Sequence, residues 1–253
     1  MGNDGRPTPD RDVQPHHERS HPENDARQEV DVSGRLNWLR AGVLGANDGI
    51  VATAAIVLGV AAATTSRTAI LTAGIAALTA GAMSMAAGEY ASVSSQRDSE
   101  KAMLAKQRRE LSQTPEEELA KLTNLYADKG LSRALAETVA RELTDHDALG
   151  AHAEADLGVD PDGLTSAWTS AFASLIAFAV GALVPLVGIA FPPTAWRIGV
   201  TVVASLLALA ATGILAARLG RSPTAKPLWR NLISGTLAMA VTYSIGSLVG
   251  HVL

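Results

Sequence analysis

Hydrophobic positions in this chain are gathered into long runs instead of recurring at helical or alternating spacing. Five runs carry few charges and are long enough to cross a bilayer, which takes about 20 mostly apolar residues. They cover residues 39–63, 69–87, 167–191, 198–217 and 232–253. A soluble all-α protein would carry charged residues on one face of each helix, and these runs do not. The pattern predicts an all-α integral membrane protein with five transmembrane helices.

The segment between the second and third runs, residues 98–165, is charged and helical in its spacing. Its start, "DSEKAMLAKQRREL", continues the second run without a helix breaker, so that helix is expected to project out of the membrane. Pro115, followed by three glutamates, is typical of a helix start, and Gly130 of its end. A third helix is expected between Ser132 and Gly158. We therefore predict a three-helix domain, called the insert below, between transmembrane helices 2 and 3.

The chain thus divides into four regions. Residues 1–34 are polar and rich in Pro and Asp, and are expected to be a disordered tail, not a signal peptide. Residues 35–97 hold transmembrane helices 1 and 2. Residues 98–165 form the insert, and residues 166–253 hold transmembrane helices 3 to 5.

Lysine and arginine flank the runs unevenly, which predicts an orientation. They gather before the first run, after the second, and between the fourth and fifth, at Arg35, Arg40, Arg97, Lys101, Lys106, Arg108, Arg109, Arg218, Arg221, Lys226 and Arg230. The other two connections hold only Arg67 and Arg197. Because cytoplasmic loops carry the excess of positive charge, the N-terminus and the insert are expected in the cytoplasm.

The composition of the chain excludes several kinds of site and partner. The chain has no cysteine, which excludes disulfides, zinc–thiolate sites and thiol catalysis. Its formal net charge of −4 is too small to indicate a nucleic-acid partner. We expect a membrane protein that contacts lipid, with no prosthetic group and no enzymatic activity.

The stretch "GANDGIV" places an ionisable group inside the first apolar run. Asp48 lies beside Asn47 and between Gly45 and Gly49. A carboxylate in lipid is costly, and one that is present usually faces a bundle interior, a cavity or an ion path. The two glycines, four residues apart, are expected to let the first helices of two copies approach closely in a homodimer.

The second run carries candidate metal ligands of two kinds, thioethers and a carboxylate. Met83 and Met85 lie in a Gly/Ala/Ser-rich helix, and Glu89 follows one turn after Met85. A thioether and a carboxylate together bind a soft divalent cation and discriminate against Mg²⁺ and Ca²⁺, which prefer oxygen ligands alone. The carboxylate can also take a proton when the metal leaves. We therefore interpret Asp48, Asn47, Met85 and Glu89 as a transport pathway.

The insert holds a second group of candidate ligands. On its third helix, steps of three and four residues join Glu142, Asp145, Leu149, His152 and Asp156, which are expected on one face. On its first helix, the same spacing joins Glu100, Met103, Gln107 and Glu110. Such a set, converging from different helices, would suit Fe²⁺ or Mn²⁺. A solvated helical surface is the alternative interpretation.

Four segments together resemble the vacuolar iron transporter family. They are "WLRAGVLGANDGIV", "LTAGAMSMAAGEYASVSSQRD", "SAFASLIAFAVGALVPL" and "RNLISGTLAMAVTYSIGSLVG", and the resemblance covers residues 35–253. It implies five transmembrane helices, a homodimer, a helical cytoplasmic metal-binding domain and proton-coupled export of Fe²⁺, often with Mn²⁺. The family's pore aspartate falls on Asp48 and its pore methionine on Met85.

The chain departs from the family at several matching positions. Acidic residues of some members are replaced by Asn37, Ala41 and Ala77 in the membrane. In the insert, Glu110, Glu118 and Asp156 match metal-binding carboxylates. Other matching positions hold Gln107, Lys121 and, in place of a methionine, His152. The resemblance therefore implies a sparser metal site in the insert.

These patterns predict a transporter that exports Fe²⁺, and Mn²⁺ as well, from the cytosol in exchange for protons. We expect it in the cytoplasmic (inner) membrane of a bacterium. Two alternatives stay open: a non-transporting membrane metal sensor or interaction protein, and a divalent-cation channel. Pro185, in the third run, is compatible with either a tolerated kink or a helix break near the pore.

Overall fold

The computed structural model describes residues 22–159, 166–220 and 223–252. This part of the chain contains seven α-helices, one π-helical turn and no strand. The elements are α1 (Pro22–Ala63), α2 (Arg67–Gln113), α3 (Pro115–Asp128), α4 (Arg133–His152), η1 (Ala153–Leu157), α5 (Ala167–Ala190), α6 (Arg197–Leu219) and α7 (Ala225–Val252). Five helices are long and apolar enough to cross a membrane, as the hydrophobic runs predicted.

Helix α1 begins earlier than the sequence suggested. The tail was expected to extend to residue 34, but the structure has a helix from Pro22 onward, and residues 1–21 lie outside the described part. Proline suits the first helical position, and the acidic residues of "PENDARQEV" lie near the positive end of the helix dipole. Nothing in this segment breaks a helix, so it continues into the first apolar run.

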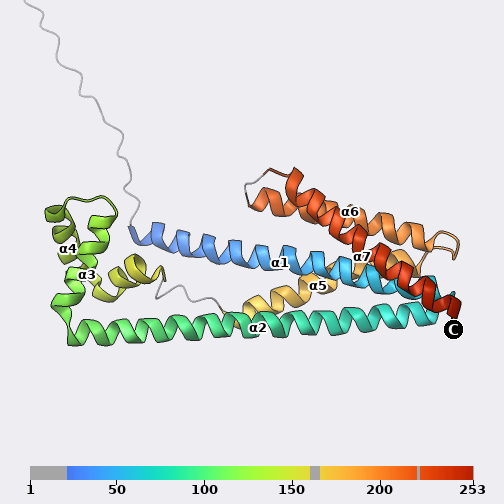
Figure 1. Cartoon of the computed structure of the whole chain (residues 1–253), viewed down its shortest axis with the longest axis horizontal. Helices are drawn as coiled ribbons and strands as arrows, with labels where there is room; N and C mark the ends of the chain where they lie inside the picture. Colours follow the sequence, from blue (N-terminus) through green and yellow to red (C-terminus); the bar gives the residue numbers. More distant parts are fainter. Residues whose placement is uncertain (1–21, 160–165, 221–222, 253) are drawn as a thin grey trace, which may run out of the picture.

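Helix α2 is one uninterrupted helix of 47 residues, as the absence of a breaker predicted. At 1.5 Å per residue it is about 70 Å long, more than twice the thickness of a hydrocarbon core. Figure 1 shows it along the whole length of the molecule, with α3 and α4 packed at the end remote from α5, α6 and α7. The charged half of α2 therefore extends beyond the membrane-spanning bundle.

Helix α1 is held between α5 and α7 by glycines. A Cβ atom on Gly49 would lie 2.1 Å from the Phe178 carbonyl oxygen, and one on Gly181 would lie 2.1 Å from the Ala46 oxygen. On the α7 side, a Cβ on Gly246 would lie 1.9 Å from the Gly59 oxygen. Only glycine allows backbones this close, as in other small-residue contacts between membrane helices.

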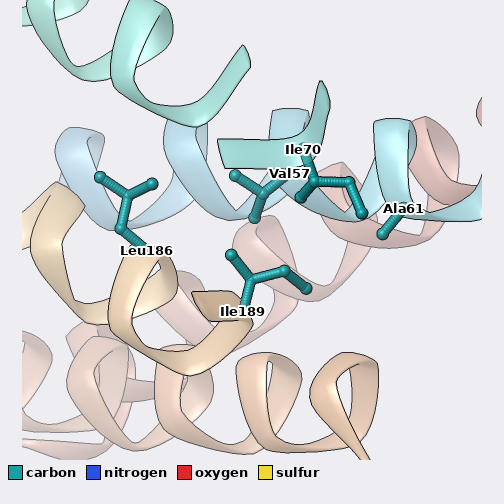
Figure 2. Close-up of a cluster of buried hydrophobic side chains, with 5 residues drawn as sticks. All are labelled: Val57, Ala61, Ile70, Leu186 and Ile189. Carbon is teal, nitrogen blue, oxygen red and sulfur yellow. The ribbon is translucent and has the colours of Figure 1, made fainter. Parts of the chain in front are cut away.

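A buried cluster packs the end of this bundle at which α1 connects to α2. Figure 2 shows Val57 and Ala61 of α1, Ile70 of α2, and Leu186 and Ile189 of α5 meeting between the three helices. The cluster fixes the relative level of α1 and α2, the two helices that carry the candidate pathway residues.

Pro185 does not break α5. The helix runs from Ala167 to Ala190 through the proline, whose ring is among the most buried side chains of the protein. Of the two interpretations, the tolerated proline is the one seen in the structure.

Exposed aromatic residues occur near both ends of the apolar bundle. Tyr90 packs against Trp168 with ring centroids 4.7 Å apart, and Trp168 stacks on Phe172 at 5.9 Å. Phe191 and Trp196 are exposed at the opposite end of α5. Amphipathic rings of this kind gather at membrane–water interfaces. We therefore place Tyr90, and with it the end of the membrane segment of α2, at one interface.

The helices of the insert begin and end where the sequence indicated. The Ser132 hydroxyl accepts a hydrogen bond from the Leu135 backbone N–H at 3.4 Å, which caps α4. Gly130 and Gly158 adopt positive φ angles of 103° and 64° after their helices. Such angles disfavour any residue with a Cβ, which explains both glycines.

Candidate functional site

The candidate membrane carboxylate, Asp48, lies on the surface of the chain. Its side chain is exposed, whereas the next residue, Gly49, is buried against α5. Asp48 is about 22 Å along α1 from Ala63, so it lies well inside the span. A carboxylate at this depth requires water or protein around it rather than lipid.

Asn47 points to a different neighbour. Its side-chain oxygen lies 3.4 Å from the Thr212 hydroxyl of α6, which also donates to the Leu209 carbonyl at 3.0 Å. The asparagine therefore links α1 to α6. This contact helps to fix the rotation of α1 about its axis, with the neighbouring Asp48 side chain directed outward.

Met85 lies at the same level of the bundle as Asp48. It packs on the cluster of Ala82, Phe178 and Ala182, which Ala52 of α1 also touches. Ala52 is one turn after Asp48 on the same face of α1. The two candidate pore ligands therefore come from adjacent helices that meet on one α5 residue, Phe178.

Phe178 is a positioning residue that the sequence did not reveal. Its ring would lie 2.3 Å from a Cβ on Gly81 of α2, and its backbone receives Gly49 of α1. Only 4% of the side chain is exposed. A single phenylalanine in an apolar run gives no signal in a sequence, because its role depends on which helices face it.

Glu89 and the second methionine lie at the edge of this region. Glu89 is half-buried and precedes Tyr90, the residue at the membrane interface. Met83 is 65% exposed and is not part of the Phe178 cluster on which Met85 packs. Of the two methionines, Met85 is therefore the one that packs on the cluster shared with α1.

In the insert, the structure brings Gln107, Glu118, Lys121, His152 and Asp156 together. Glu118 Oε2 lies 2.5 Å from Gln107 Nε2, 3.8 Å from Lys121 Nζ and 3.5 Å from His152 Nδ1. Asp156 Oδ2 lies 2.5 Å from the same Lys121 Nζ. We call these five residues the insert cluster.

Charge and burial act on two members of the insert cluster. The hydrogen bond to Asp156 raises the pKa of Lys121, with further attraction from Glu118 and Glu110. Burial lowers the pKa of His152, although Glu118 opposes the change. The lysine is therefore charged and the histidine neutral at pH 7.

The other predicted insert ligands do not contact the cluster directly, although Glu110 is near enough to attract Lys121. Glu142, Asp145 and Met103 are exposed. Glu100 accepts a hydrogen bond from Gln96 at 3.0 Å, and Glu110 pairs with Lys106 at 3.4 Å. Among the described residues, no group of three or more His, Asp or Glu side chains is arranged to hold a metal ion.

The single ligand face predicted for the third helix of the insert does not form. Asp147 has non-helical angles (φ −154°, ψ 92°), and its carboxylate accepts a hydrogen bond from the Gly150 N–H at 3.0 Å. The aspartate thus interrupts the helix and caps the segment after it. A π-helical turn then follows His152. These two irregularities separate Glu142 and Asp145 from His152 and Asp156.

Known proteins are similar to this chain over most of its length. A family model described as "VIT family" matches residues 39–247. The chain belongs to the VIT family. It is 40% identical to a protein of Acanthamoeba castellanii named "Vacuolar iron transporter", over 90% of this chain and 85% of that protein. It is 37% identical to "Vacuolar iron transporter homolog 3" of Arabidopsis thaliana, over 90% of this chain and 91% of the relative.

Membership of the VIT family confirms the resemblance seen in the sequence. The role expected for Gly45 and Gly49 in a homodimer is wrong. Gly45 and Gly49 both face α5 of the same chain, where a Cβ on Gly45 would lie 3.0 Å from the Ser174 oxygen. These glycines therefore serve packing within one chain, and any contact between copies would have to use other surfaces.

Proposed function

We propose that this VIT-family protein exports Fe²⁺, and Mn²⁺ as well, from the cytosol in exchange for protons. The observation that carries the proposal is Asp48, a carboxylate exposed at membrane depth and level with the thioether of Met85. The relatives are named as iron transporters, and not as enzymes, which supports the same class of function.

The chemistry of the pair suits a partly dehydrated soft cation. A carboxylate supplies charge, and a thioether supplies a ligand that Mg²⁺ and Ca²⁺ do not favour. When Asp48 takes a proton its charge disappears, and the metal loses its strongest ligand. Protonation and release would therefore be coupled, so a proton gradient would drive export.

A second copy of the chain would complete the pathway. The exposed side chain of Asp48 cannot face lipid at low cost, and the helices of its own chain leave it uncovered. In a homodimer whose two copies of α1 meet on the face that carries Asp48, both carboxylates would line one shared path. The pathway would then be lined by both copies of Asp48 and Met85.

The insert would capture metal on the cytosolic side. The distribution of Lys and Arg supports this orientation, because the charged half of α2 carries much of the excess. Glu89, near the interface, would lie between the insert and Met85. We propose the inner membrane of a bacterium as the location.

Transport by reconstituted protein tests the proposal. Wild-type protein in proteoliposomes is expected to move Fe²⁺ and Mn²⁺ when a pH gradient is imposed, and Asp48→Asn is expected to abolish this movement. Asp98→Asn is the matched control, because Asp98 is an exposed carboxylate on the part of α2 beyond the membrane. Its rate is expected to equal that of the wild type.

Three other results would contradict the proposal. Undiminished transport by Asp48→Asn would remove Asp48 from the pathway. A protein that binds metal but never moves it, under any gradient, would be a sensor or interaction protein. Metal currents that need no proton gradient would identify a channel.

A further inference from the structure

The insert cluster contains a lysine, Lys121, whose ammonium group lies between two carboxylates. Without this lysine, the same carboxylates could bind a cation from solution. Lys121 Nζ contacts Asp156 Oδ2 at 2.5 Å and lies 3.8 Å from Glu118 Oε2. One ammonium group therefore neutralises carboxylates from two elements, α3 and η1. A divalent ion bound between these oxygens would occupy the same region and satisfy the same charges.

His152 is the observation that points to a ligand. None of its side chain is exposed, and neither ring nitrogen has a hydrogen-bond partner in the described part of the chain. Buried polar atoms almost always have a partner. Its Nδ1 is 3.5 Å from Glu118 Oε2, so the imidazole faces the same oxygen as the lysine. A neutral imidazole without a partner is a ready ligand for a borderline divalent metal.

We propose that Lys121 is a tethered cation that occupies a divalent-metal site formed by Glu118, His152 and Asp156, and thereby keeps the metal affinity of the insert low. The lysine side chain is 41% exposed, and its flexible stem can carry the ammonium out to water. Its departure leaves two carboxylates and one imidazole, a donor set suited to Mn²⁺ or Fe²⁺. Metal and lysine therefore compete for one position.

This competition explains two features of the insert. The described residues contain no ready metal group, because the lysine holds Asp156 in an ion pair. The three helices also pack around the cluster without a metal, because the ammonium already compensates the buried Glu118. The inference rests on the capture role proposed for the insert, but it concerns binding and does not require that the chain transports.

Mn²⁺ binding to the purified full chain in detergent tests the inference. Every variant carries Asp48→Asn, which removes the membrane carboxylate from the measurement. Adding Lys121→Ala is expected to tighten Mn²⁺ binding about tenfold or more, because a positive charge a few ångströms from the metal is removed. Lys129→Ala is the matched control, since Lys129 is an exposed lysine beside Tyr126 at the end of the same helix. It is expected to leave the affinity unchanged.

Three further variants locate the effect. Lys121→Arg keeps the charge and is expected to bind Mn²⁺ as weakly as the parent. Lys121→Gln keeps a hydrogen-bond donor for Asp156, and is expected to reproduce the gain even if the alanine variant folds poorly. Adding His152→Ala to Lys121→Gln is expected to remove the gain. Melting curves with and without Mn²⁺ should follow the same order, with the largest rise in the uncharged variants.

The inference is overturned if both uncharged variants bind Mn²⁺ no more tightly than the parent. It is also overturned if Lys129→Ala gives an equal gain, which would indicate a general effect of net charge. A gain that survives the loss of His152 would place the metal elsewhere. None of these outcomes depends on transport, so failure of the inference is distinguishable from failure of the proposed function.

Discussion

Asp48 and Met85 are placed by different kinds of contact. The outward direction of Asp48 follows from the burial of Gly49 against α5 and from the contact of Asn47 with Thr212. Met85 is placed by packing against Phe178 and Ala82. The carboxylate is therefore free to meet a metal, a proton or a second chain, while the thioether is held by packing at the same level of the bundle.

Replacing Met85 by leucine separates the sulfur from the packing. Leucine has nearly the same volume, so we expect the protein to fold with at most about 1.5 kcal/mol of lost stability. Without the thioether, the maximal rate of Fe²⁺ transport should fall several-fold, and discrimination against Mg²⁺ should weaken. Both quantities can be measured in proteoliposomes with competing ions.

Met83→Leu is the control for this change, because Met83 is two residues away and lies outside the Phe178 cluster. It should leave rate and selectivity unchanged. Equal effects of the two substitutions would mean that the sulfur of Met85 has no special role.

At the scale of elements, the sequence predicted the features that depend on composition alone. Apolar runs of about 20 residues can be buried only by lipid or by other helices, so the five spans and their approximate ends were evident. The continuous α2 followed from the absence of a breaker. The interruption at Asp147 did not, because an aspartate inside a helical pattern is ambiguous until its carboxylate is seen to cap Gly150. The ion pair of Lys121 with Asp156 depends on how α3 and η1 pack against each other. This packing cannot be predicted from the spacing of residues in the sequence.

The close approach of α1 and α5 gives an element-scale prediction. Gly49→Ala would place a methyl group 2.1 Å from the Phe178 oxygen, so one backbone has to move. We expect a loss of roughly 2–3 kcal/mol of stability, seen as a lower melting temperature in detergent. Gly42→Ala, on the same helix, meets nothing within 4 Å and should be neutral or slightly stabilising. Equal melting temperatures for both variants would show that the contact is looser than described.

For the whole molecule, the central question is what covers the face of α1 that carries Asp48 and Leu44. One chain buries one face of α5 against α1 and α2 but leaves Asp48 and Leu44 of α1 exposed, one turn apart. Leu44 could face lipid, whereas Asp48 could not. A homodimer that joins this face would give both residues a protein environment and would create a pathway between two copies of the same chain.

Cross-linking between single cysteines tests this homodimer directly. The chain has no cysteine, so Leu44→Cys introduces a unique thiol one turn from Asp48 on the same face of α1. If the two copies of α1 meet there, oxidation in membranes should give a covalent dimer. Leu207→Cys on α6 is the control, because Leu207 is also exposed, at 67%, but belongs to a helix not expected at the interface. It should stay monomeric. Dilution with excess lipid should suppress chance collisions and leave a stable dimer intact. If Leu207→Cys cross-links and Leu44→Cys does not, the copies join through another face, and Asp48 must then be covered by water within a single chain.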